Sequence, residues 1–368
     1  MHFCIKILKN PKKILIIIQR SNGDVFLIFS LIKSLYDGFQ SPQIDLLVND
    51  DTLAIAKLIP FIKNIHTFSY KKKSQSRWKQ EKNIIISLFR KYDLSVNLTA
   101  SDRSVFYALI ASKIAISALE KNPIKSWWKK ILLTHYYFFD SSKHILQNNL
   151  KPLKFLNISS SNSHCSFEIS NESTRALEKK LQDLKIKDFI IFHPSAQYHY
   201  KIYPQHLRDK LLNELSKLGV FILITGSNSK IDLEIKKSLP KLPNLIDFIG
   251  ETTLEQLVSL TKLSLAYIGM DTLNMHIAAS QNKPIFAIFG PTNLKIWSPW
   301  SNDLNIAATE NQPMQKYGNI TIFQAALPCV ACAKAGCDNN QWRSECLYII
   351  DPNIILNQVT YWYENASV

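Results

Sequence analysis

The chain has 368 residues, of which 46% are hydrophobic and 20% charged, with only 9 glycines and 15 prolines. This composition excludes a collagenous, low-complexity or disordered chain, and the length predicts two globular domains. Residues 1–150 carry 23 Lys and Arg against 10 Asp and Glu, a net charge of +13, whereas residues 151–368 have a net charge of +2. The basic part is therefore expected to meet nucleic acid, a membrane surface or a phosphorylated substrate, unless its lysines are merely solvated.

The sequence holds no candidate for a membrane-spanning segment. No stretch approaches the ~20 apolar residues that cross a bilayer. The apolar run Ile14–Ile18 is too short for the core of a signal peptide, and Gln19 and Arg20 interrupt it. We therefore expect a cytoplasmic chain, either free or peripheral to a membrane.

In the first part of the chain, short β-branched runs alternate with helical patterns. Strands are predicted at 14–19, 43–48, 65–69 and 94–98, and helices at 25–36, 52–58, 83–90 and 103–112. This alternation indicates right-handed βαβ units in a parallel sheet. The polar stretch 157–164 follows, with four serines and two asparagines, and is the predicted linker.

The same alternation returns after the linker. Strands are predicted at 189–193, 220–225, 245–248, 265–268 and 284–289, and helices at 172–184, 204–218, 230–239, 254–262, 273–280 and 353–363. The sequence thus predicts an α/β protein with two successive doubly wound domains. In such domains ligands bind outside the carboxyl ends of the strands.

The turn after the first predicted strand holds Asn22, Gly23 and Asp24. A carboxylate at a helix start is stabilised by the helix dipole and could take a proton from a hydroxyl, but Asp is also a common helix cap. The glycine fingerprint of dinucleotide-binding proteins is absent, so no nicotinamide cofactor is expected.

Three later loops hold candidate ligands of a phosphate or a sugar. Ser195 follows a strand, with Lys201 close behind it, which suits a diphosphate, although a lone lysine is more often solvated. Gly226 and Ser227 follow the next strand, where a base or ribose could lie. The densest motif is Gly269–His276, in which Asp271 and Thr272 open a helix and could bind sugar hydroxyls. A histidine placed like His276 is more often a packed core residue than a catalytic one. Another polar turn follows the next strand, at Gly290, Pro291 and Thr292.

The order of these motifs along the chain, ending in Trp297-Ser298-Pro299-Trp300, resembles glycosyltransferase family 9, the lipopolysaccharide heptosyltransferases. The resemblance implies a GT-B fold, two Rossmann-like domains that face each other across a cleft. Residues 1–165 would bind the acceptor and residues 166–350 the nucleotide-sugar donor, and the helix in 351–368 would pack back on the N-terminal domain.

The resemblance also implies an inverting reaction that needs no metal, with ADP-heptose as donor and a Kdo-lipid A type acceptor of the lipopolysaccharide inner core. Asp24 would be the catalytic base, with Asn22 and Gly23 beside the acceptor. The implied donor ligands are Ser195, Lys201, Gly226, Ser227, Asp271, Thr272, His276, Gly290, Pro291 and Thr292. Such an enzyme would work at the cytoplasmic face of the inner membrane, and nucleic acid would not be its partner.

Two positions depart from the family pattern. Leu273 stands where a glycine is common, and the carboxylate that often holds the ribose has no clear match, Asp232 being the nearest. Alternatives therefore stay open: a family 9 transferase for another sugar or core position, a GT-B sugar-nucleotide epimerase, or a non-catalytic protein that binds anionic surfaces.

Four cysteines with the spacing C-x2-C-x4-C-x8-C lie after the last motif: Cys329, Cys332, Cys337 and Cys346. Four thiols at this density could bind zinc or an iron–sulfur cluster as a structural metal site. Reduced thiols or local disulfides are the preferred interpretation.

Two basic stretches contain tryptophans, at Lys71–Lys82 with Trp78 and at Lys121–Leu132 with Trp127 and Trp128. Lysines beside tryptophans suit the interface of an anionic membrane, and a solvated lysine face is the alternative.

Overall fold

The computed structural model describes residues 10–71, 73–161, 167, 169–339 and 342–366, and it divides the chain into two compact units, 1–168 and 169–368. Of the predicted features, Lys72 of the first basic stretch and residues 162–164 of the linker lie outside the described residues. The division lies close to the boundary expected at 165/166.

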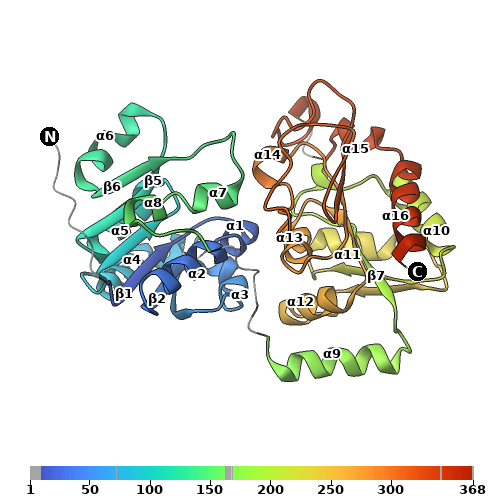
Figure 1. Ribbon diagram of the computed structural model, residues 1–368, viewed down its shortest axis with the longest axis horizontal. Coiled ribbons are helices and arrows are strands. Elements are labelled where there is room, and N and C mark those ends of the chain that lie inside the picture. Colours follow the sequence, from blue (N-terminus) through green and yellow to red (C-terminus); the bar gives the residue numbers. More distant parts are fainter. Residues whose placement is uncertain (1–9, 72, 162–166, 168, 340–341, 367–368) are drawn as a thin grey trace. The chain divides into compact units, whose positions relative to one another are not determined.

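The first unit contains a parallel sheet of six strands in the order β3-β2-β1-β4-β5-β6 (Figure 1). The strands are β1 (Lys13–Ile17), β2 (Gln43–Asn49), β3 (Ile62–Phe68), β4 (Leu94–Asn97), β5 (Ile114–Leu119) and β6 (His135–Phe138). Residues 14–17 of the central strand β1 are completely buried, as expected for a parallel strand with helices on both faces. The prediction for the four strands up to β4 is confirmed, and β5 and β6 were missed.

The helices of this unit are α1 (Asn22–Phe26), α2 (Phe29–Gly38), α3 (Leu53–Ala56), α4 (Lys73–Leu88), α5 (Asp102–Ala111), α6 (Pro123–Leu132), α7 (Ile145–Asn149) and α8 (Leu153–Leu156). The single helix predicted at 25–36 is wrong, because the chain breaks between α1 and α2. Leu15 and Ile17 pack with Ile84 of α4 and with Val105 and Ala108 of α5, so α4 and α5 cover one face of the sheet.

The second unit contains a sheet of seven strands in the order β12-β13-β11-β10-β7-β8-β9. The strands are β7 (Phe189–His193), β8 (Phe221–Gly226), β9 (Leu245–Ile249), β10 (Tyr267–Met270), β11 (Ile285–Ile288), β12 (Met314–Tyr317) and β13 (Ile320–Phe323). All pairs are parallel except β12 with β13, and that hairpin was not predicted. From β9 to β13 the strand order repeats that of the first sheet, the order of a Rossmann domain.

The helices of the second unit are α9 (Asn171–Asp183), α10 (Gln205–Ser216), α11 (Lys230–Lys237), α12 (Leu254–Leu263), α13 (Leu273–Ser280), α14 (Leu294–Trp297), α15 (Glu345–Ile349) and α16 (Pro352–Ala366). Two apolar clusters fill the two faces of the sheet, one with α10, α11 and α16, the other with α9, α12 and α13. The C-terminal helix α16, expected on the N-terminal domain, lies beside α10 (Figure 1), and its Ile355 and Val359 are buried in the second unit's own core.

None of the helices in the described part of the chain combines the length and the apolar composition needed to cross a membrane.

Gly269 allows the central strands of the second sheet to pair. A Cβ at this position would overlap the carbonyl oxygen of His193 on the adjacent strand β7, and a backbone atom in a paired strand has little room to move.

We expect Gly269→Ala to lower the free energy of unfolding by about 3 kcal/mol, because the added methyl forces β7 and β10 apart. Urea unfolding followed by circular dichroism measures this loss. In the control Gly38→Ala the three nearest atoms belong to the side chain of Ile158 and not to a backbone, so its change should be smaller, within about 1 kcal/mol. Equal stability of the two variants would contradict the explanation.

Candidate functional site

Polar residues from four adjacent strands, β8, β7, β10 and β11, meet at the carboxyl edge of the second sheet. These are the residues predicted from the sequence: Ser195 after β7, Gly226 and Ser227 after β8, Asp271 and Thr272 after β10, and Gly290, Pro291 and Thr292 after β11. Between β7 and β10 the crossover helices turn to opposite faces of the sheet, which leaves the strand ends open to a ligand. The fold therefore brings this predicted set to one edge, while the role of each residue stays a prediction.

Lys201 and Asp271 form an ion pair where β10 passes into α13. Lys201, from the short 3-10 helix His199–Lys201, has its Nζ 3.5 Å from Oδ2 of the largely buried Asp271. Thr272 is the N-cap of α13, but its side chain makes no capping hydrogen bond to the first turn. The first-turn N–H groups and the lysine together favour an anion such as a phosphate.

Three buried polar atoms near this edge make no hydrogen bond within the described residues: Oδ1 of Asp232, Nδ1 of His276 and Oγ1 of Thr292. Buried polar atoms are seldom left unpaired, and a polar ligand is one way to satisfy them. His276 and Thr292 belong to the predicted donor set.

Asp232 lies closer to this edge than its sequence position suggested. Its Oδ2 accepts hydrogen bonds from Oγ of Ser227 and Oγ of Ser229, at 2.5 and 2.6 Å. Its Oδ1 faces the end of β8, where a Cβ on Gly226 would come within 2.7 Å. The sequence identified Asp232 only as the nearest carboxylate, because its spacing from the loop does not follow the family pattern.

Two histidines at this edge are neutral at pH 7. Burial lowers the pKa of both His193 and His276 to about 4. Nδ1 of His193 lies 3.0 Å from Oγ1 of Thr225 and 2.8 Å from Nδ2 of Asn274, a buried polar network that links β7, β8 and α13. His276 therefore brings no positive charge to the site at this pH.

The low pKa of His276 predicts a loss of stability in acid. Below the ordinary pKa of 6.5 the unfolded chain binds a proton that the folded chain accepts only near pH 4, so the free energy of unfolding falls between these values. We expect His276→Gln to reduce the loss between about pH 7 and about pH 5 by about 2 kcal/mol. Urea unfolding at both pH values tests this. The exposed His206, changed to Gln, is the control, and an equal acid loss in the two variants would contradict the prediction.

The predicted base, Asp24, lies at the carboxyl edge of the first sheet, in the turn after β1. Its side chain is buried and occupies the N3 position of α1. Oδ2 accepts hydrogen bonds from Oγ of Ser21 at 2.6 Å and from N of Ser21 at 3.3 Å, so Asp24 does cap the helix. Nε of Arg20 forms an ion pair with Oδ1 at 2.9 Å without a well-directed hydrogen bond, so Oδ1 accepts no hydrogen bond from the described residues. Asn22 is exposed and Gly23 half-buried on the same turn.

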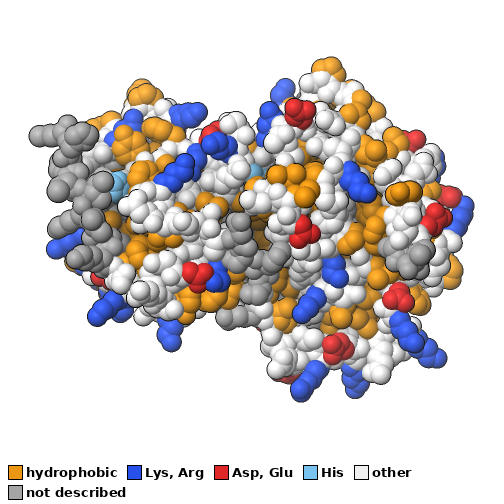
Figure 2. Space-filling model, in the orientation of Figure 1, with side chains coloured by type: hydrophobic (Ala, Val, Ile, Leu, Met, Phe, Trp, Pro, Cys, Tyr) orange, Lys and Arg blue, Asp and Glu red, His pale blue; other side chains and the backbone are white. Residues whose placement is uncertain are grey.

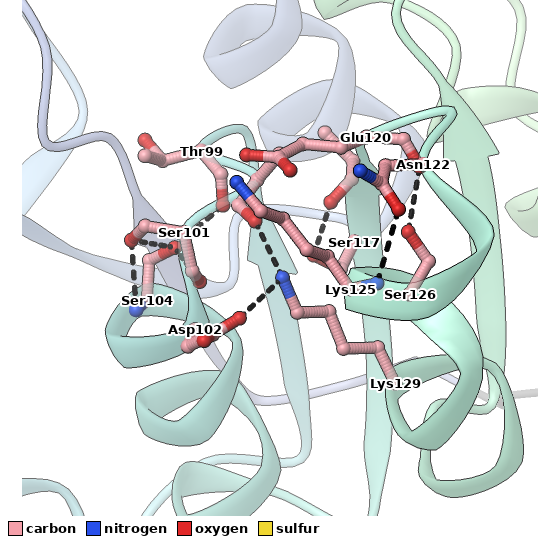
Figure 3. A network of polar contacts seen from close by, with 12 residues as sticks. Thr99, Ser101, Asp102, Ser104, Ser117, Glu120, Asn122, Lys125, Ser126 and Lys129 are labelled. Carbon is pink, nitrogen blue, oxygen red and sulfur yellow. Dashed lines mark hydrogen bonds and ion pairs between the residues drawn. The ribbon is translucent and has the colours of Figure 1, made fainter.

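The loop after β4 is a part of this edge that the sequence analysis missed. Because β4 pairs with β1, the loop lies beside the turn that carries Asp24, and N of Gln19 donates to Oγ1 of Thr99 at 3.0 Å. Figure 3 shows how the buried Lys129 of α6 holds the loop: its Nζ donates to the carbonyl of Ala100 at 2.9 Å and lies 2.6 Å from Oδ1 of Asp102. The polar run 99–102 directly after a predicted strand was the available signal.

The four clustered cysteines are free thiols. Cys346 is buried, and burial, reinforced by the charges of the other three cysteines, raises its pKa to about 11. N of Glu345 donates to Sγ of Cys337 at 3.4 Å. In the part of the chain that the structure describes, no three His, Cys, Asp or Glu side chains are arranged to hold a metal ion.

Residues 83–326 match the sequence profile of "Glycosyltransferase family 9 (heptosyltransferase)". The chain belongs to this family. It is 26% identical over 296 residues, 78% of this chain and 85% of the relative, to "Lipopolysaccharide heptosyltransferase 3" of Escherichia coli K12. The resemblance noted in the sequence is thereby confirmed, and the chain is a glycosyltransferase rather than an epimerase or a non-catalytic binding protein.

Solved structures share the fold. The structure of E. coli ADP-heptose lipopolysaccharide heptosyltransferase II aligns with a TM-score of 0.68 and 16% identity, over 97% of this chain and all of that one. E. coli heptosyltransferase WaaC with ADP aligns with a TM-score of 0.69 and 13% identity, over 95% and 99%. The predicted α/β fold of the GT-B class is confirmed.

Proposed function

We propose that this family 9 enzyme transfers a heptose from ADP-heptose to the inner core of lipopolysaccharide, on a Kdo-lipid A type acceptor, with inversion and without a metal ion. The observation that carries the proposal is the pair of Lys201 and Asp271 at the uncapped start of α13, at the switch point of the second sheet. The names of the relatives support the heptose, the nucleotide and the lipopolysaccharide acceptor.

In the proposed reaction Oδ1 of Asp24 takes the proton from the acceptor hydroxyl, and that oxygen attacks the anomeric carbon of the sugar. The bond from this carbon to the diphosphate oxygen breaks on the opposite face, so the configuration inverts and ADP leaves. Lys201 and the first-turn N–H groups of α13 stabilise the negative charge that grows on the leaving diphosphate. Ser195 would hold the same diphosphate.

The acceptor side would be the first unit. Its part of the chain up to residue 150 has a net charge of +13, which suits a phosphorylated and carboxylated acceptor at the cytoplasmic face of an anionic inner membrane. A second candidate is transfer of another sugar or to another core position. Leu273, half-buried in the first turn of α13, favours this candidate because it fills space that a glycine would leave beside the sugar.

A transfer assay with ADP-heptose and truncated lipopolysaccharide acceptors, followed by mass spectrometry, tests the proposal. The acceptor should gain the mass of one heptose, and NMR of the product should show the opposite anomeric configuration to that of the donor. Transfer from a different nucleotide sugar, with no transfer from ADP-heptose, would favour the second candidate.

In that assay Asp24→Asn should lower kcat at least about 100-fold, because the amide cannot take the acceptor proton. The amide oxygen can still accept from N of Ser21, so this variant keeps the helix cap while it removes the base and the ion pair with Arg20. Binding of ADP, measured by calorimetry, should stay close to wild type. A kcat near that of the wild type would rule out Asp24 as the base.

Lys201→Met should weaken ADP-heptose binding about tenfold or more, because a charge-assisted contact to the diphosphate is lost. The exposed Lys217→Met, at the C-terminal end of α10, is the matched control and should not change it. If the site works without a metal, transfer should continue at the same rate in a chelator. Loss of turnover on chelation, restored by a divalent cation, would contradict this part of the proposal.

A further inference from the structure

Helix α6 exposes most of its apolar side chains and buries one of its lysines. Surface helices usually bury their apolar face and expose their polar one. Here Lys129 is only 1% exposed and Ser126 is buried, whereas Ile124, Trp127 and Ile131 are 83%, 61% and 73% exposed.

The exposed apolar residues form one continuous stripe. Ile124, Trp127 and Ile131 are spaced by three and four residues, so they share one side of the helix. Leu132 at its end is exposed as well. Basic side chains border the stripe, since Lys121 and Lys125 are exposed, and Figure 2 shows apolar and basic side chains next to one another in the region where Figure 1 places α6.

The polar side of α6 is firmly held by the protein. Asn122 caps the helix by accepting from N of Ile124 at 3.0 Å, and Oγ of Ser126 donates to the carbonyl of Glu120 at 2.6 Å. Lys129 reaches the loop after β4, as Figure 3 shows. These contacts orient the helix so that the apolar stripe faces outward.

We infer that this stripe inserts into the interface of an anionic lipid bilayer and docks the first unit on it. A helix with aromatic and aliphatic residues on one side and lysines along the border is the type that lies in the plane of a membrane interface. Tryptophan suits the boundary between head groups and acyl chains, and the lysines complement anionic lipids.

The position of α6 indicates how docking would serve the reaction, and this step rests on the proposed function. The helix begins directly after β5, at the carboxyl edge that also carries Asp24 and the loop held by Lys129. A lipid-linked acceptor that leaves the bilayer beside α6 has its sugar head group next to that edge. The inference adds to the proposed function the surface that reaches the lipid.

Vesicle co-sedimentation of the full chain tests the docking without any substrate. Wild type should bind vesicles of phosphatidylethanolamine with phosphatidylglycerol, and the double variant Trp127→Glu, Ile131→Glu should bind them at least about tenfold more weakly. Lys125→Glu should weaken binding to these vesicles but not to vesicles in which an uncharged lipid replaces phosphatidylglycerol.

The control double variant Ile349→Glu, Tyr361→Glu changes side chains of similar exposure, 53% and 63%, in the second unit and should bind vesicles like wild type. Both double variants should unfold at the wild-type temperature, since the changed side chains are exposed. Equal vesicle binding by the Trp127 and Ile131 double variant and wild type would overturn the inference. The inference would also be overturned if wild type were a dimer and this variant a monomer. The stripe would then bind a second copy of the chain and not a membrane.

Turnover with a water-soluble, deacylated acceptor separates this inference from the proposed function. The Trp127 and Ile131 double variant should keep that turnover, because neither side chain belongs to the candidate site. If wild type docks on vesicles but transfers no heptose, the proposed function fails and the docking surface stands. If wild type transfers heptose but binds no vesicles, the docking inference fails alone.

Discussion

The parallel pairing of β10 with β7 is the constraint on which the candidate site of the second sheet depends. Gly269 lets the two strands approach so closely that a side chain there would overlap the His193 carbonyl. Because both strands end at the same edge, Ser195 and Asp271 come together from positions far apart in the chain. The network of His193, Thr225 and Asn274 then joins this pair to β8 and α13. The proposed diphosphate site is thus a consequence of strand order.

The first sheet repeats that strand order, but its edge is built differently. Asp24 serves two purposes there, because one carboxylate oxygen caps α1 and the other lies beside Arg20. The neighbouring loop is held by buried Lys129 of α6, the third element after that loop in the chain. A capping role and a catalytic role for Asp24 are therefore compatible, since they use different oxygen atoms.

The burial of Lys129 in α6 connects the loop beside Asp24 with the exposed apolar stripe. Lys129 uses the buried side of the helix to hold the loop beside the Asp24 turn, and the apolar stripe is thereby left on the outside. A lysine in this position is stable because Asp102 and the Ala100 carbonyl replace its hydration. One side chain thus accounts for the order of the loop beside Asp24 and for the exposure of the stripe.

The sequence by itself determined the two α/β domains, most of their strands and the family. Runs of β-branched residues and the order of the motifs can both be read directly from the chain. It also placed the candidate residues at strand ends, and the fold gathered those of the second unit at one edge. The sequence did not predict β5, the break between α1 and α2, the position of Asp232, or the packing of α16 on α10. Only the tertiary structure decided that Lys129 is buried and Trp127 exposed, because burial in α6 follows from a long-range ion pair and not from hydropathy.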